Sequence, residues 1–318
     1  FWIGDTPHGI WILVKAINAL LFGWMVFLLW RISKALSPDA NLGDRLFGVV
    51  LVSVYPMWVV MAGYSFAQIA FVPFFLLVVL AFIQAIHSGV PGSLKLGIIA
   101  GFLYWIHPTA LAPLTAVCIS AAYVAWVRGR FRSLVVIMLS IGCMIVVYSS
   151  VVTPWLHDRM TISGAAPSLH HSGLSAMVPR LLDIKGLTEI VARLGGHIFY
   201  LGVGTVGLIY VSLISFVETR RGLYSSGDAD TFMPVRAVRV FLGLSLAGAI
   251  ALSVVFLSLG TGVPRLDHWI YGRYVEGVIA PILLIGALSP SLRKGLWAIP
   301  VATFGALLLA IDLGSYTH

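Results

Sequence analysis

The chain has little charge. Asp, Glu, Lys and Arg together make up 10% of its 318 residues, against about 25% in soluble globular domains. Apolar residues make up 59% of the chain, which is more than an ordinary water-soluble fold contains. They fall into runs of about 20, the length that crosses a bilayer as a helix. A soluble fold is therefore excluded, and we expect an integral membrane protein.

Cysteine is scarce as well. The two residues, Cys118 and Cys143, each lie inside an apolar run, where a small buried packing role is expected rather than a disulfide or a metal site. The histidines of the long polar segment, His157, His170 and His171, lack a recognised metal-ligand spacing. No phosphate-binding loop, dinucleotide fingerprint, GxSxG elbow or HExxH motif occurs in the sequence. We therefore expect no metal and no cofactor.

The net charge of +8 does not indicate nucleic-acid binding. The 20 Lys and Arg residues stand in short clusters between apolar runs, without a basic stripe interleaved with aromatics. Most of these clusters fall on one side of the membrane if the chain crosses it ten times. The positive-inside rule then places both chain ends outside.

The apolar runs predict an all-α fold, a polytopic membrane helix bundle of about ten transmembrane helices in a single transmembrane domain, residues 1–318. The predicted helices cover residues 10–30, 46–62, 66–86, 94–107, 109–127, 134–153, 197–217, 238–259, 273–289 and 296–314. An outer-face loop with amphipathic helices is expected over residues 154–196, since its second half repeats apolar residues at a helical period. The two short helices that meet at His107 and Pro108 form, alternatively, one broken or re-entrant element.

Ionisable residues at membrane depth are costly, so each one suggests a function. Lys15 lies about one turn from Asn18 in the first predicted helix, and both would face the same cavity or the same neighbour. The alternative is that Lys15 lies near the outer end of the helix and extends its ammonium to the headgroups.

The densest polar cluster outside the predicted helices comes just before the ninth of them. Arg273 and Glu276 share a helix face near the outer interface, next to Asp267 and His268. A guanidinium there is suited to bidentate binding of a lipid phosphate. The alternative is an aromatic belt anchored by an Arg–Glu pair. The belt would consist of Trp269, Tyr271 and Tyr274.

Two further candidates lie at helix ends. Asp5 stands outside the membrane before the first predicted helix, where it is placed either to act as a general base or to start the helix as part of an Asp-Thr-Pro turn. His107 precedes Pro108, and a structural break with a hydrogen-bonded imidazole is the alternative to a role as a ligand.

Four stretches of the chain carry a family resemblance. They are Tyr55-Pro56 with Gly63-Tyr64-Ser65-Phe66-Ala67-Gln68, Gly97-Ile98-Ile99-Ala100-Gly101 through His107-Pro108-Thr109, Gly195-Gly196-His197-Ile198-Phe199-Tyr200-Leu201, and Tyr271-Gly272-Arg273-Tyr274. In this order they resemble the membrane glycosyltransferases of the GT-C superfamily, the polyprenyl-phosphate-sugar-dependent enzymes that include protein mannosyltransferases and aminoarabinose transferases. Together they span most of the chain.

The resemblance implies an enzyme of the plasma (inner) membrane that transfers a sugar, with inversion, from a lipid-phosphate-linked donor to an acceptor at the outer face. Its partners would be the lipid-linked sugar donor, membrane lipids and other membrane subunits. Arg273 is the position that the resemblance assigns to the donor phosphate or the cavity. The further candidates for that site are Lys15, Asp267, His268, Tyr271 and His107.

The family's catalytic carboxylate lies in a first outer loop that follows an N-terminal helix. That helix and loop would stand upstream of Phe1, and Asp5 lies downstream of the place where the acidic motif belongs, so the catalytic role transfers to Asp5 only weakly. The alternative is a non-catalytic, GT-C-like membrane scaffold or an assembly subunit of a larger membrane complex. A transporter is a third hypothesis, with which the break at His107 and Pro108 agrees.

Overall fold

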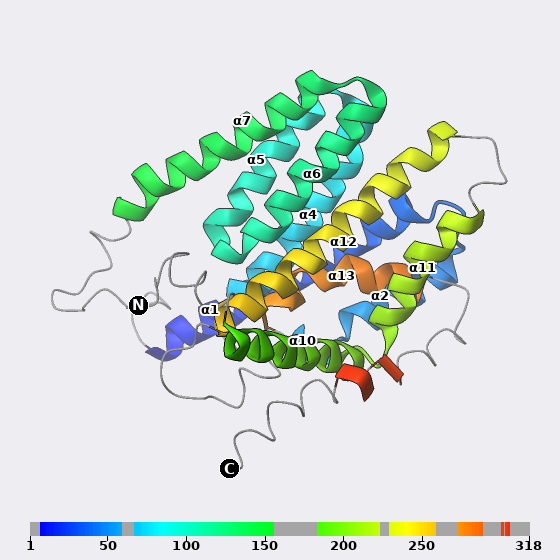
Figure 1. Cartoon of the computed structure of the whole chain (residues 1–318). Coiled ribbons are helices and arrows are strands. Elements are labelled where there is room, and N and C mark those ends of the chain that lie inside the picture. The colour runs from blue at the N-terminus through cyan, green and yellow to red at the C-terminus, as the bar shows by residue number, and fades with distance from the viewer. Residues whose placement is uncertain are drawn as a thin grey trace, which may run out of the picture.

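The computed structural model describes residues 7–58, 67–155, 183–222, 229–258, 273–288, 300–301 and 303–305. Its helices are α1 (Pro7–Leu36), α2 (Leu42–Ser53), α4 (Ala67–Ser88), α5 (Val90–Ile106), α6 (Leu111–Arg128), α7 (Phe131–Val147), α10 (Ile184–Gly204), α11 (Leu208–Gly222), α12 (Ala229–Ser258) and α13 (Arg273–Ala287). A 3-10 turn (Pro108–Ala110) precedes α6, and a π-helical turn (Tyr148–Val152) follows α7. No strand occurs in these residues, and the all-α prediction is confirmed (Figure 1).

Among the described residues, five helices are long and apolar enough to cross a membrane, and a bent pair of helices raises the number to six. The five are His8–Leu36, Ile69–Ser88, Leu111–Arg128, Phe131–Trp155 and Pro234–Val255. The helices α5 and α13 are apolar but shorter. The chain is therefore a multi-pass membrane protein, while the number of ten crossings stays a prediction. Most of the predicted last helix, 296–314, lies outside the described residues.

The predicted helix 197–217 is wrong, because the chain there is not one straight span. The helix α10 already begins at Ile184 and continues to Gly204, after which the chain bends by 102° into α11. The bend occurs at Val206 and Gly207, whose φ angles of 49° and 77° a right-handed helix cannot contain. The expected boundary at residue 196 fails because an amphipathic helix continues into an apolar one without a break. Residues 156–182 of the expected outer loop lie outside the described part of the chain.

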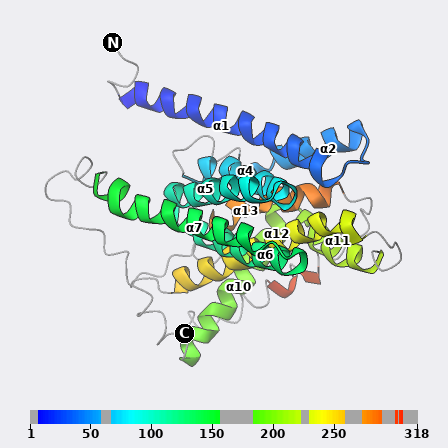
Figure 2. The same ribbon diagram turned by 90° about the horizontal axis from the view of Figure 1, so that it is seen from above.

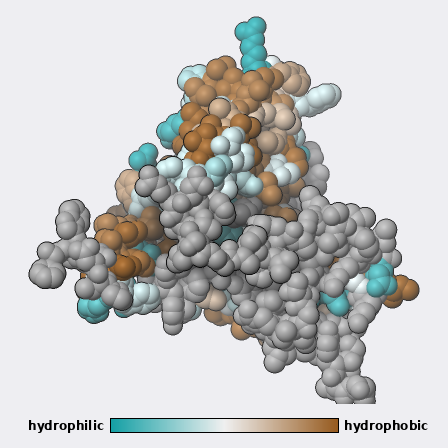
Figure 3. Space-filling model, turned by 90° about the vertical axis from the view of Figure 1, so that its left-hand side faces the viewer, coloured by the Kyte–Doolittle hydropathy of each residue, from teal (hydrophilic) through white to brown (hydrophobic). Residues whose placement is uncertain are grey.

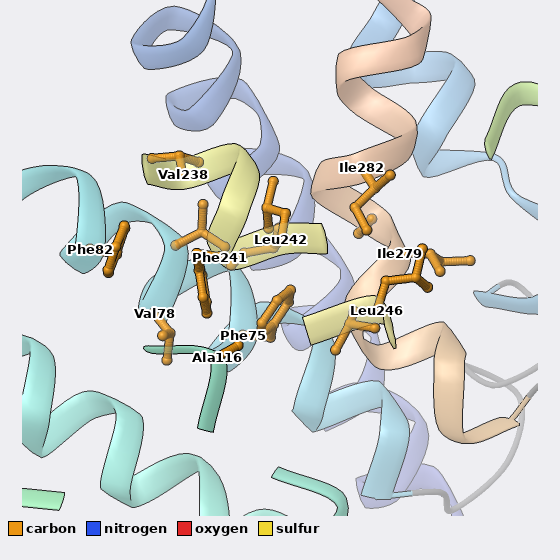
Figure 4. Close-up of a cluster of buried hydrophobic side chains, with 14 of the residues drawn as sticks. Phe75, Val78, Phe82, Ala116, Val238, Phe241, Leu242, Leu246, Ile279 and Ile282 are labelled. Carbon is orange, nitrogen blue, oxygen red and sulfur yellow. The ribbon is translucent and has the colours of Figure 1, made fainter. Parts of the chain in front are cut away.

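Aromatic rings of α4 and α12 form the centre of the bundle. The rings of Phe75 and Phe82 lie 5.8 and 5.0 Å from the ring of Phe241, and all three side chains are fully buried or nearly so. Ile279 and Ile282 of α13 approach the same cluster (Figure 4). Rings at these separations pack favourably beyond the area they bury, so α4, α12 and α13 make one core.

The outer helices turn apolar side chains to the surroundings. Only 22% of the apolar window of α1 and 11% of that of α7 is buried, against 61% for α4. Figure 2 shows α1 along one edge of the bundle, and Figure 3 shows apolar side chains covering much of the described part of one face. A water-soluble protein does not expose apolar helix faces of this extent, so lipid is the solvent that these faces require.

Two glycines bring α5 and α7 together. A β-carbon at Gly97 would lie 2.5 Å from the Cβ of Ser140, and one at Gly101 would lie 2.5 Å from the Cβ of Met144. Such distances are far inside van der Waals contact, so only glycine fits at both positions. Small residues spaced by four on a membrane helix allow this close approach of two backbones.

Basic side chains from several connections meet at one end of the bundle. The guanidinium groups of Arg128 and Arg130 both donate to the backbone oxygen of Ile86 at 2.9 Å. Lys95 donates from Nζ to Gln84 Oε1 at 3.1 Å. The structure thus places the end of α4, the start of α5 and the connection between α6 and α7 side by side, as the positive-inside assignment requires. We call this the basic end.

Candidate functional site

A buried carboxylate lies near the start of α13. Glu276 has no exposed surface, and the hydroxyl of Tyr200, on α10, donates a short hydrogen bond to its Oε1. The hydroxyl of Tyr55, which follows α2, lies 3.4 Å from that of Tyr200. Three segments far apart in the sequence therefore meet at one polar group. We call these three residues the tyrosine–glutamate cluster.

Both tyrosines bond to the carboxyl group of Glu276. Tyr200 donates its hydroxyl proton to Oε1, and Tyr55 also forms a side-chain hydrogen bond with Glu276. The two tyrosine hydroxyls lie 3.4 Å apart, which is long for a hydrogen bond between two hydroxyls. The two phenols therefore hold the carboxyl group in place between them.

Glycines make room for the cluster on both sides. A β-carbon at Gly204 would lie 3.3 Å from the hydroxyl of Tyr55, and one at Gly277 would lie 2.4 Å from Cδ1 of Phe71. The first contact brings the end of α10 against Tyr55, and the second brings α13 against the start of α4. Glu276 is therefore held between closely packed helices rather than in open space.

The tyrosine–glutamate cluster lies far from the basic end. Phe71, beside Gly277, and Ile86, which binds the two arginines, are 15 residues apart on α4, a distance of about 22 Å at 1.5 Å per residue. That is most of the thickness of a bilayer core. The two sets of polar groups consequently lie toward opposite ends of α4.

A second buried polar pair joins α10 to α12. His197 and Ser253 have 0% and 1% of their surface exposed, and Nε2 of the imidazole lies 2.7 Å from the serine Oγ. Nδ1 lies 2.8 Å from the backbone oxygen of Arg193. Because a carbonyl only accepts, Nδ1 carries the proton, and Ser253 donates to Nε2 of the neutral ring. A histidine base beside a serine resembles the arrangement of a nucleophile, but both ring nitrogens of His197 are hydrogen-bonded and the bond to Ser253 joins two packed helices, so we assign the pair a structural role.

The predicted candidates Asp5, Asp267, His268 and Tyr271 lie outside the described residues. Arg273 is the first residue of α13, one turn before Glu276, and its side chain is not among those described.

The remaining two candidates are described and lie on different elements. Lys15 is exposed on α1, with Nζ 5.1 Å from the centre of the Trp11 ring, whereas Asn18 is buried, so the two do not face the same neighbour. His107 ends α5, and its Nδ1 lies 2.8 Å from Oγ1 of Thr109. The backbone N–H of Thr109 also donates to that nitrogen at 3.2 Å, as a hydrogen-bonded break between α5 and α6 requires.

A pocket lies between α4, α5, α6 and α7, at the basic end rather than beside the tyrosine–glutamate cluster. Most of its lining is apolar, and its polar members are Ser93, Arg130 and Ser133. No group of three or more possible metal ligands occurs in the described part of the chain.

Sequence reasoning weighed Glu276 only as an ion-pair partner of Arg273, and it took Tyr55 and Tyr200 only as members of the family-like stretches. A usable signal was present, because a carboxylate inside a predicted apolar helix suggests a function. What the sequence did not show is which residues surround that carboxylate, since they come from three separate segments.

Comparison with known proteins identified no relative of the chain. No family model, no curated protein and no solved structure matches the chain. The function must therefore be argued from the chain's own residues.

Proposed function

We propose that the protein is a lipid-linked-sugar glycosyltransferase, which transfers a sugar from a lipid-phosphate donor to an acceptor at the outer face of the plasma membrane. One observation carries the proposal. Three of the four stretches that resemble the GT-C superfamily supply or directly precede the tyrosine–glutamate cluster: Tyr55 belongs to the first, Tyr200 to the third, and Glu276 follows the last by two residues. Stretches that share a catalytic site are expected to meet in this way.

The chemistry of the tyrosine–glutamate cluster supports the proposal. A buried carboxylate in a membrane protein is costly and suggests a function by default. Arg273 stands one turn before it on α13, and a guanidinium is the side chain best suited to a phosphate leaving group. A carboxylate and a guanidinium one turn apart are the two charges that transfer of a sugar from a phosphate needs, one for the acceptor proton and one for the leaving group.

The position of the site agrees with an outer-face reaction. The basic end faces the cytoplasm under the positive-inside rule, and the tyrosine–glutamate cluster lies about 22 Å away along α4. Under that rule the cluster belongs to the outer half of the membrane, on the side of the headgroups of the outer leaflet.

The test is a transfer assay on the purified full chain in phospholipid nanodiscs. Tritium-labelled undecaprenyl-phosphate hexoses and pentoses serve as donors and octyl glycosides as acceptors. We expect label in the glycoside fraction, and Arg273→Ala should lower kcat/KM by about 10²-fold, the usual effect of losing a group that stabilises developing charge. Arg132→Ala, an exposed arginine at the basic end, is the control and should leave the rate unchanged. Absence of transfer from every donor by the unaltered protein would refute the proposal.

A second candidate function is transport, favoured by the 102° bend between α10 and α11. Broken helices at membrane depth often line substrate paths in transporters. Uptake of a labelled substrate into sealed vesicles without covalent transfer would select this function. The carboxylate on α13 and the absence of a recognised repeat in the sequence make it the weaker of the two.

A further inference from the structure

Two arginines converge on one atom at the basic end. Nη1 of Arg128 and Nη1 of Arg130 both lie 2.9 Å from the backbone oxygen of Ile86, so these two nitrogens are within about 6 Å of each other, a separation at which like charges repel. Each guanidinium makes this one hydrogen bond among the described residues, although it has five N–H donors. Two cations with most of their donors left for another group therefore stand side by side.

The four helices around this point carry no acidic residue. Residues 67–155, which include all of α4, α5, α6 and α7, contain no aspartate and no glutamate. Their lysine and arginine residues are Lys95, Arg128, Arg130 and Arg132. Capping of α4 explains part of the arrangement, because basic side chains stabilise the free carbonyl groups at a helix C-terminus. A carbonyl oxygen is uncharged, however, so these helices still need an anion from outside them to balance their charge.

The pocket between α4, α5, α6 and α7 begins beside these arginines. Arg130 and Ile86 both belong to its lining. Its two serines, Ser93 and Ser133, are among the first four residues of α5 and of α7. The apolar lining extends as far as Ile137, seven residues beyond Arg130 and thus about 10 Å further along α7. The pocket is consequently cationic and polar at the basic end and apolar further in.

We propose that this pocket binds an anionic phospholipid, with the phosphate held by the guanidinium groups of Arg128 and Arg130 and the upper acyl chain against the apolar lining. Guanidinium groups match phosphate oxygens in geometry and charge, and basic pockets between membrane helices bind lipid headgroups. Under the positive-inside rule the basic end borders the cytoplasmic leaflet, which carries anionic lipids. A soluble phosphate would use the arginines but leave the apolar part of the pocket without a partner. The site is independent of sugar transfer and of the tyrosine–glutamate cluster.

The test is native mass spectrometry of the purified full chain in non-ionic detergent micelles. The chain is titrated with palmitoyl-oleoyl phosphatidylglycerol and, separately, with zwitterionic phosphatidylcholine of the same acyl chains. We expect one phosphatidylglycerol to be retained, with a Kd at least about 10-fold below that of phosphatidylcholine. The double variant Arg128→Gln, Arg130→Gln removes both charges and keeps an N–H donor on each side chain. Its Kd for phosphatidylglycerol should rise about 30-fold, since each basic residue near the membrane surface contributes about 5-fold.

Matched variants control for net charge and for the fold. Arg31→Gln, Lys34→Gln also removes two charges, from the end of α1, where neither residue lines the pocket, and it should bind phosphatidylglycerol as the unaltered chain does. Ala121→Leu fills the apolar part of the pocket and should raise the Kd at least about 5-fold, whereas Ala122→Leu, at an exposed position of α6, should leave it unchanged. If the double glutamine variant does not fold, Arg130→Gln alone should raise the Kd about 5-fold.

Four results would overturn the proposal. The first is an equal Kd for phosphatidylglycerol and phosphatidylcholine. The second is a glutamine variant of the pocket arginines that binds phosphatidylglycerol as tightly as the α1 control, which would mean that the arginines only cap α4. The third is an unchanged Kd in Ala121→Leu, which would remove the pocket from the site. The fourth is displacement of the bound lipid by an excess of glycerol 1-phosphate, which would assign the arginines to a soluble phosphate instead.

Discussion

Replacing Gly97 by alanine should weaken the contact between α5 and α7. The new β-carbon would lie 2.5 Å from Cβ of Ser140 and 3.0 Å from the backbone oxygen of Ile137. Two carbons prefer a separation of about 3.5–4.0 Å, so the helices must move apart by about 1 Å. The oxygen belongs to the backbone of α7, so no change of rotamer relieves that contact. Overpacking of this kind costs about 1–3 kcal/mol.

The control for this prediction is Gly142→Ala, on α7. A β-carbon there would meet nothing within 4 Å. Both substitutions gain about 1 kcal/mol of helix propensity, so this gain cancels when they are compared. The difference in unfolding free energy between the two variants, expected at about 1–3 kcal/mol, isolates the cost of the close contact.

The assay is reversible unfolding in mixed micelles, followed by tryptophan fluorescence. The double variant Gly97→Ala, Ser140→Gly should recover part of the loss, because it removes the atom at 2.5 Å and leaves the one at 3.0 Å. Equal stability of Gly97→Ala and Gly142→Ala would refute the argument, since it would mean that the two backbones are not in close contact.

Two further predictions concern α10 and its neighbours. Ser253→Ala should lower the free energy of unfolding by about 1–3 kcal/mol because it leaves Nε2 of His197 buried and unpaired; Ser245→Ala, whose hydroxyl bonds only within its own helix, should cost clearly less, and equal losses in thermal unfolding would contradict the hydrogen bond. Val206→Gly should stabilise the protein by about 1 kcal/mol, since Val206 holds a φ of 49° while 93% exposed. The same change at Val203, inside α10, should destabilise by about 1 kcal/mol, and a loss of stability at Val206 would show that its backbone is not strained.

Much of the fold could be predicted from the sequence, because a bilayer restricts both the composition and the secondary structure of the segments that cross it. A chain with 59% apolar and 10% charged residues cannot fold as a water-soluble domain. Within a bilayer, a helix satisfies the hydrogen bonds of its own backbone groups. The predicted helix 66–86 agrees closely with α4 (Ala67–Ser88). The predicted helix 46–62 is wrong, because α2 (Leu42–Ser53) ends before Tyr55 and Pro56, where proline disfavours a helical conformation of the residue that precedes it. Where hydrophobicity changes without a helix breaker, as at residue 196, the prediction failed.

The candidate site was accessible only in part. The resemblance named the stretches that contain Tyr55 and Tyr200, and charge spacing drew attention to Arg273 and Glu276. No local pattern indicates that the hydroxyl of Tyr200 bonds to Glu276 or that Trp58 lies beside Tyr55. Each of these contacts joins residues whose positions depend on how separate helices pack.

The sequence by itself determined that this protein is helical and membrane-embedded, and it predicted that most of its basic connections lie on one side of the membrane. These conclusions were possible because hydrophobicity and charge act on each segment independently of the others. Only the tertiary structure decided that α10 bends into α11 and that a buried carboxyl group lies between two tyrosines from distant segments. Those features arise from contacts between helices distant in the chain, and such contacts depend on the shapes of both partners at once.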